Sequence, residues 1–167
     1  MNEAELIQEQ SAGIMLTPDG FKLLQHELEQ LKTVKRPEIA DRIRESQQHG
    51  EFSEDNSELD EVKFEQAMVE NRIAELQALF AHAHVLDIDA IPTDRVSVGL
   101  VVSVLDPQFD DKFDVRVVSS IEADPSRDLI SNESPMGMAL LGKAPNEDVV
   151  FEAPEGKKKF KVLGIRR

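Results

Sequence analysis

Apolar residues recur at helical spacing through most of the first half of the chain. In the segment 16–32, LTPDGFKLLQHELEQLK, the steps of three and four residues place one set on a single helical face: Phe21, Leu24, Leu28 and Leu31. Thr17 is a suitable N-cap, Pro18 suits the first helical position, and Asp19 suits the electropositive first turn. The pattern predicts an amphipathic helix that begins at Pro18 and buries its apolar face.

Pro37 interrupts this pattern. A proline inside a helix removes one hydrogen bond and clashes with the preceding turn, so we expect a kink or short break at 35–37. The helix then resumes, with Ile39, Ala40 and Ile43 continuing the apolar face. Gly50 suits the left-handed position that closes a helix.

A second helical segment follows an acidic stretch. Its apolar positions alternate steps of three and four over more than three heptads, and only Gln66 among them is polar: Leu59, Val62, Gln66, Val69, Ile73, Leu76, Phe80 and Ala83. Two long helices joined by a short turn bury such seams by folding back on each other. The sequence predicts an antiparallel coiled-coil hairpin whose second arm, of about 28 residues, extends roughly 40 Å.

The second half of the chain changes period. Apolar and polar positions alternate in 95–105, 112–120, 147–154 and 157–165, which is typical of strands. Between them, Ser134 suits an N-cap, Pro135 a first helical position and Gly142 a terminator, which predicts a short helix. We therefore expect an α+β protein divided into a mobile tail (1–13), a coiled-coil hairpin (14–85), a proline-containing linker (86–95) and a small α+β domain (96–167).

Composition narrows the function classes. The chain has 167 residues, 40% of them hydrophobic, and a formal net charge of −14. This charge opposes direct binding to nucleic acid, so any action near DNA or RNA would be indirect, through another protein. The chain has no cysteine, no signal-peptide pattern and no apolar run near the roughly 20 residues of a membrane span. We expect a cytoplasmic protein that does not contact the membrane, and a monomer.

The acidic stretch between the helices, GEFSEDNSELDE at 50–61, holds the candidate chemistry. Glu58, Asp60 and Glu61 fall in the first turns of the second helix, where anions are favourable, and Ser57 with Asp60 has capping-box spacing. Glu51 and Glu54 instead follow the end of the first helix, where the carbonyl groups disfavour anions. Local structure does not explain this pair, which favours a functional role, although ordinary solvated surface charge remains an alternative.

Metal binding by the chain alone is not favoured. The acidic stretch lacks the glycine and the bidentate glutamate of a calcium-binding EF-hand loop. Two carboxylates hold Mg²⁺ weakly unless other ligands join them, which suggests a site shared with another molecule's phosphate chemistry. His82 and His84 do not share a helical face, which disfavours zinc, and His49 adjoins the acidic stretch. Met136 and Met138 suit either a binding surface or core packing.

Three segments together resemble the bacterial Gre family of transcript cleavage factors: the helix start at 16–32, the stretch 34–77 that spans the acidic turn, and LISNESPMGMALLGK at 129–143. The resemblance runs from about residue 15 to the end of the chain. It implies that a coiled coil enters the secondary channel of RNA polymerase, while a C-terminal domain of FKBP-like fold docks on the rim. It also implies a factor with no enzymatic activity of its own, which stimulates the polymerase to cleave backtracked RNA.

The resemblance assigns roles to individual residues. The family's tip motif of glycine, aspartate, leucine, a variable residue, glutamate and asparagine corresponds here to Gly50, Glu51, Phe52, Ser53 and Glu54, followed by Asp55 and Asn56. It implies that Glu51 and Glu54 are the catalytic acids, which hold a Mg²⁺ ion shared with the polymerase and position water. Phe52, Ser53, Asp55, Asn56 and Glu58 would shape the tip. Lys63 matches a basic position near the RNA 3′ end, and Ser134 with Pro135 match the docking loop.

Three departures from the family pattern leave an alternative open. Glu51 replaces the family's aspartate, and Asp55 stands as an additional residue before Asn56. Gln47 also stands where some members carry arginine. Some relatives with very acidic tips inhibit the polymerase through the same channel without cleavage, and this is the second hypothesis. A coiled-coil interaction protein with no link to polymerase is the third.

Overall fold

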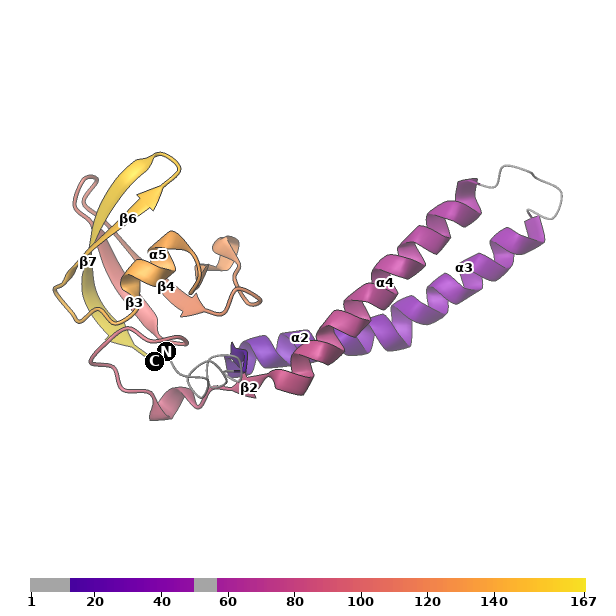
Figure 1. Ribbon diagram of the computed structural model, residues 1–167, viewed down its shortest axis with the longest axis horizontal. Coiled ribbons are helices and arrows are strands. Elements are labelled where there is room, and N and C mark those ends of the chain that lie inside the picture. The colour runs from indigo at the N-terminus through magenta and orange to yellow at the C-terminus, as the bar shows by residue number, and fades with distance from the viewer. Residues whose placement is uncertain (1–12, 50–56) are drawn as a thin grey trace, which may run out of the picture. The chain divides into compact units, whose positions relative to one another are not determined.

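The computed structural model describes residues 13–49 and 57–167 (Figure 1). The chain forms two compact units. One is Phe21–His82, and the other combines 13–20 with Ala83–Arg167. The first is helical and the second is built mainly of strands, which confirms the predicted α+β class.

The helical unit is an antiparallel hairpin (Figure 1). Its first arm is continuous through α2 (Pro18–Gln30), the π-helical segment η1 (Leu31–Lys35) and α3 (Arg36–His49). Its second arm is α4 (Ser57–His82). The predicted fold of this half is confirmed.

Of the kink or short break expected at 35–37, the break is wrong, because the helix is continuous there. The arm instead widens into the π-helical turn η1, where the Arg36 N–H donates to the Leu31 carbonyl five residues back. A wide turn of this kind relieves the clash between a proline ring and the preceding turn, so the helix continues through Pro37. The proline changes the helix type locally without ending the helix.

The hairpin core follows most of the predicted seam. Ile39 is buried on the first arm, and Val62, Ile73 and Leu76 are buried on the second. At the base, the rings of Phe21 and Phe80 meet edge to face with centroids 5.3 Å apart. Among the described residues, Gln66 and Ala40 differ in being exposed, and Ser46 and Leu79 differ in being buried. An exposed Gln66 keeps its amide hydrated, which avoids the cost of burying an unpaired polar group.

The start of α2 is fixed by a capping arrangement. The Thr17 hydroxyl accepts a hydrogen bond from the Gly20 N–H at 3.1 Å, which confirms the predicted N-cap. Glu122 accepts two further bonds, from the Thr17 N–H at 2.8 Å and the Thr17 hydroxyl at 2.5 Å. Just before this cap, β1 (Met15–Leu16) pairs in parallel with β2 (His84–Val85), and η2 (Ile88–Ala90) follows β2.

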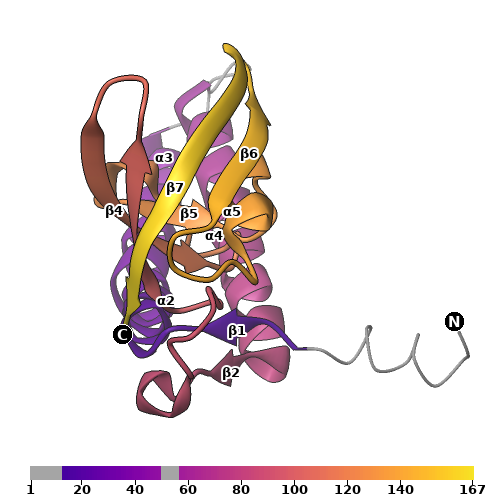
Figure 2. The same ribbon diagram turned by 90° about the vertical axis from the view of Figure 1, so that its left-hand side faces the viewer.

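In the described part of the chain, the second unit contains a five-stranded sheet (Figure 2). The strands are β3 (Val101–Asp106), β4 (Asp111–Val118), β5 (Leu129–Ser131), β6 (Asp148–Ala153) and β7 (Gly156–Arg166), in the order β5-β4-β3-β7-β6. Neighbours are antiparallel except β4 and β5, which are parallel. The turn η3 (Pro125–Arg127) leads into β5.

Two details of this sheet differ from the sequence prediction. The first strand starts at Val101 rather than 95, because Gly99 adopts a positive φ of 97° and turns the chain before the strand begins. Strand β5 was not predicted, since it is only three residues long and shows no alternation that sequence could reveal. The other predicted strands correspond to β4, β6 and β7.

The core of this unit lies between one face of the sheet and α5 (Pro135–Leu140). Val102 and Val104 of β3, Val117 of β4 and Val162 of β7 are fully buried against Leu140 of α5. Alternate residues on these strands face the other side of the sheet, as expected for a strand period of two. Among the described residues, no helix is both long and apolar enough to cross a membrane.

Candidate functional site

The candidate acids belong to the segment that connects the two arms of the hairpin. Helix α3 ends at His49 and α4 begins at Ser57. Glu51, Glu54 and the tip-shaping residues Phe52, Ser53, Asp55 and Asn56 lie outside the described residues, so their roles stay predictions. The structure describes the two arms on either side of this segment, up to His49 and from Ser57.

The described residues next to the tip are acidic and exposed. Glu58 and Asp60 lie in the first turn of α4, where they face the positive end of the helix dipole. Ser57 is the first described residue of α4, so its capping-box role stays a prediction. Lys63 follows one turn later and is exposed.

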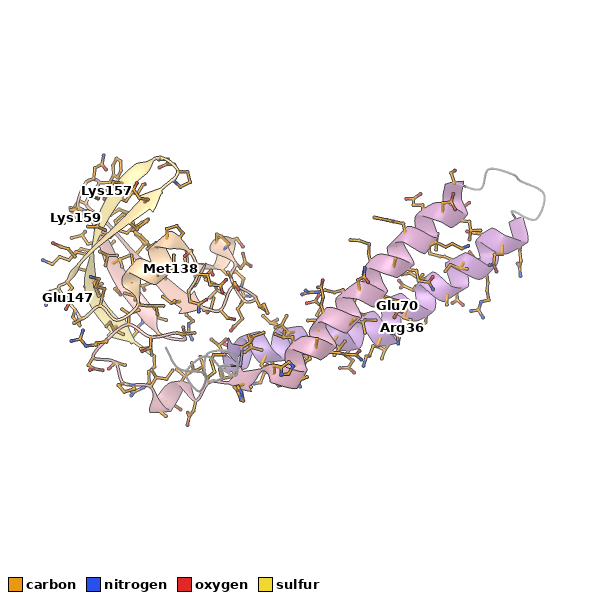
Figure 3. All side chains as sticks on the ribbon, in the orientation of Figure 1. Arg36, Glu70, Met138, Glu147, Lys157 and Lys159 are labelled. Carbon is orange, nitrogen blue, oxygen red and sulfur yellow. The ribbon has the colours of Figure 1, made fainter. Side chains whose placement is uncertain are left out.

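Ion pairs link the two arms, and Figure 3 labels one of them, Arg36 with Glu70. The Arg36 guanidinium donates two hydrogen bonds to the Glu70 carboxylate, each 2.8 Å long. Arg72 makes a similar two-bond contact with Glu27, at 2.6 and 3.0 Å, and Arg42 donates to Glu65 at 2.6 Å. Paired bonds of this kind have strict geometry, so they favour one register between the arms.

The contact between Arg36 and Glu70 changes the pKa of both groups. The hydrogen bonds from Arg36 lower the pKa of Glu70, and those to Glu70 raise the pKa of Arg36. Both side chains are 46% exposed, and exposed ion pairs contribute little to the free energy of unfolding. Their main effect is to align the arms that carry the tip.

The candidate docking residues lie at the start of α5. The Ser134 hydroxyl accepts a hydrogen bond from the Gly137 N–H at 3.0 Å and donates one to the Ser131 carbonyl at 2.6 Å. Pro135 occupies the first position of the helix, and Gly142 follows its end with φ of 80°. The predicted N-cap, first helical residue and terminator are thus confirmed.

The surface next to this cap is apolar. Pro135 is exposed, and Met138, one turn farther along α5, is 60% exposed (Figure 3). Met136 packs against the core. Of the two readings considered for the methionines, core packing therefore applies to Met136 and a surface position to Met138.

Within the described ranges, no group of three or more histidine, aspartate and glutamate side chains could hold a metal ion. His82 and His84 are exposed. Any ligand set that includes Glu51 and Glu54 falls in the undescribed segment.

Sequence reasoning missed two features. Glu122 anchors the first helix from a position 105 residues away, and such a distant contact leaves no local pattern. Phe64 and Met68 on α4 are 68% and 58% exposed. The sequence could have indicated this exposure, because Phe64 and Met68 are four positions apart and both fall outside the predicted seam.

Comparisons with known proteins cover nearly the whole chain. Residues 14–85 match the family described as "Transcription elongation factor, N-terminal", and residues 91–167 match "Transcription elongation factor, GreA/GreB, C-term". The chain is 47% identical over 157 residues to transcription elongation factor GreA of Caldanaerobacter subterraneus subsp. tengcongensis, covering 94% of this chain and 99% of that protein. It is 48% identical over 154 residues to the GreA protein of Acetivibrio thermocellus, covering 92% and 96%.

A solved structure gives a further match. The crystal structure of GreA factor homolog 1 (Gfh1) of Thermus thermophilus is 30% identical and aligns over 93% of this chain and 99% of that one, with a TM-score of 0.43.

Proposed function

Because the chain belongs to the Gre family of bacterial transcription elongation factors, we propose that it inserts its hairpin into the secondary channel of RNA polymerase and stimulates cleavage of backtracked RNA. The observation that carries this proposal is the antiparallel hairpin, whose connecting segment holds Glu51 and Glu54. The chain has no nuclease activity of its own in this account. The phosphodiester bond is cleaved in the polymerase active centre.

The hairpin supplies reach and a defined direction. Helix α4 has 26 residues, so at about 1.5 Å per residue it extends roughly 39 Å. The paired hydrogen bonds of Arg36 with Glu70 and of Arg72 with Glu27 hold the arms in register. A stiff arm of this length is suited to deliver a small group of side chains into a deep channel.

Glu51 and Glu54 supply the chemistry in this proposal. They would contribute carboxylate oxygens to a Mg²⁺ ion held jointly with the polymerase, and they would orient the attacking water. The metal ions, when bound, stabilise the attacking and leaving oxygens of the reaction. Two carboxylates bind Mg²⁺ weakly alone, so the hairpin would take up the metal only in the complex. Lys63 lies near the start of α4, next to the tip. There its ammonium group would attract the negatively charged phosphates of the RNA.

The strand-rich unit supplies docking in this proposal. The Ser134 cap holds the start of α5, and Pro135 and Met138 present an apolar surface beside it. This surface would contact the rim of the channel. The net charge of −14 supports a protein partner over direct binding to nucleic acid.

The test uses a stalled, backtracked complex of the cognate polymerase that carries 5′-labelled RNA. Adding the full-length protein with Mg²⁺ should shorten the labelled RNA to a product that nucleotides extend again. Unshortened RNA with slowed extension would instead support the inhibitor that acts through the same channel. No effect on either reaction, together with no binding to the polymerase, would support a coiled-coil protein with another partner.

A further inference from the structure

An exposed apolar pair lies on α4, outside the hairpin seam. Phe64 and Met68 are four residues apart, so their side chains are neighbours on the helix surface. They are 68% and 58% exposed, whereas the seam residues Val62 and Ile73 are 1% and 2% exposed. The pair therefore lies outside the buried seam that packs the arms together.

Isolated exposed apolar residues are common and need no explanation. This pair is different because an aromatic ring and a flexible thioether side chain adjoin on the tip-proximal half of one helix. Aromatic residues and methionine are enriched at the centres of protein interfaces. The pair has the composition of a small interface centre.

The surroundings of the pair indicate the chemistry of its partner. Towards the tip, α4 carries the exposed acids Glu58, Asp60 and Glu61, and only Lys63 opposes them between 57 and 64. An apolar pair beside an excess of carboxylates complements an apolar recess bordered by cationic side chains. A second copy of this chain is a poor partner, because the same acids would meet each other and two side chains give much less area than a stable dimer needs.

We propose that Phe64 and Met68 form a contact surface for the wall of the polymerase channel, at an apolar recess flanked by basic residues. This inference rests on the proposed function and adds a binding role to the arm of the hairpin, distinct from the chemistry of its tip. The contact fixes how deeply the arm is inserted.

The test is the affinity of the full-length protein for the cognate core polymerase. The double variant Phe64→Ala/Met68→Ala should bind at least about tenfold more weakly than the wild type, as expected when an interface centre is truncated. Alanine is the strongest helix former, so the variant should retain its helicity in circular dichroism. Leu23→Ala is the matched control, because Leu23 is 51% exposed on the other arm, in α2.

The outcomes separate this inference from the proposed function. Wild-type affinity in the double variant, while the wild type binds and stimulates cleavage, would overturn only the contact surface. An equal loss of affinity in Leu23→Ala would also overturn it, because the effect would not be specific to the pair. A wild-type protein that fails to bind polymerase would overturn both, and self-association that only the double variant abolishes would replace the polymerase with a second copy.

Discussion

At the scale of single residues, the caps show what local sequence rules can and cannot establish. Thr17 and Ser134 were predicted as N-caps because each precedes a proline at the first helical position, and both accept the expected N–H. The Glu122 contact with Thr17 had no such signal, because it joins residues 105 positions apart. Local rules identify which residue caps a helix, and only the fold shows what supports the cap.

Replacing Glu122 with alanine should destabilise the protein. The variant removes a carboxylate that accepts two hydrogen bonds from Thr17, whose N–H and hydroxyl are largely buried. Hydrogen bonds to charged groups contribute about 1.5–3 kcal/mol, so we expect a loss of that order in the free energy of unfolding, measured with urea. The exposed Glu133→Ala serves as a control. Equal unfolding free energies in the two variants would contradict the anchoring role.

Gly20→Ala should depend on Glu122. A Cβ at this position would lie 1.8 Å from the Glu122 Oε1 atom, so the carboxylate would have to leave Thr17. We expect the variant to be destabilised in the wild-type background. In the Glu122→Ala background the obstruction is gone, and the same substitution should stabilise the helix by up to about 1 kcal/mol. Equal effects in the two backgrounds would show that Glu122 does not constrain Gly20.

At the scale of elements, periodicity predicted the hairpin but not its details. The alternating steps of three and four identified both arms because burial of a continuous seam requires that spacing. They could not show that Leu79 would be buried or Gln66 exposed, since this depends on how the helices are rotated against each other. They also could not distinguish a break at Pro37 from the π-helical turn that precedes it.

The Arg36–Glu70 pair should give the hairpin a defined pH dependence. The pKa of Glu70 is lowered in the folded state, so its contribution to stability is fully present above its unfolded value of about 4.3 and is lost as pH falls through the lower folded-state pKa. Glu70→Gln should therefore reduce the difference in unfolding temperature between neutral and acidic pH. Thermal unfolding from pH 7 to pH 3 measures this. An identical pH profile for wild type and variant, with exposed Glu61→Gln as control, would contradict the assignment.

At the scale of the whole molecule, the sequence predicted the order of parts because the change from helical period to strand period falls between them. It could not predict the strand order β5-β4-β3-β7-β6, which depends on pairings between residues far apart in the chain. The candidate docking surface was predicted in part. A local motif identified Ser134 and Pro135. Only the packing of α5 on the sheet shows that Met138 is exposed and that Met136 packs against the core.

Two substitutions at α5 should affect different properties, one the stability of the fold and the other the binding to polymerase. Ser134→Ala removes a helix cap and should lower the free energy of unfolding by about 0.5–2 kcal/mol. Met138→Ala removes an exposed side chain and should leave stability within about 0.5 kcal/mol while weakening binding to polymerase. Urea unfolding and a polymerase binding titration on both variants test this. Unchanged affinity in Met138→Ala would remove this methionine from the docking surface.

In the proposed function, the carboxylate of Glu54 acts in transcript cleavage. The most direct measurement is the rate of RNA shortening in backtracked complexes with wild-type protein, Glu54→Ala and Glu61→Ala. We predict that Glu54→Ala keeps its helicity and its affinity for polymerase but lowers the rate by about a hundredfold or more, while Glu61→Ala, whose carboxylate lies in the first turns of α4, stays near the wild-type rate. Equal rates for Glu54→Ala and wild type would contradict the claim.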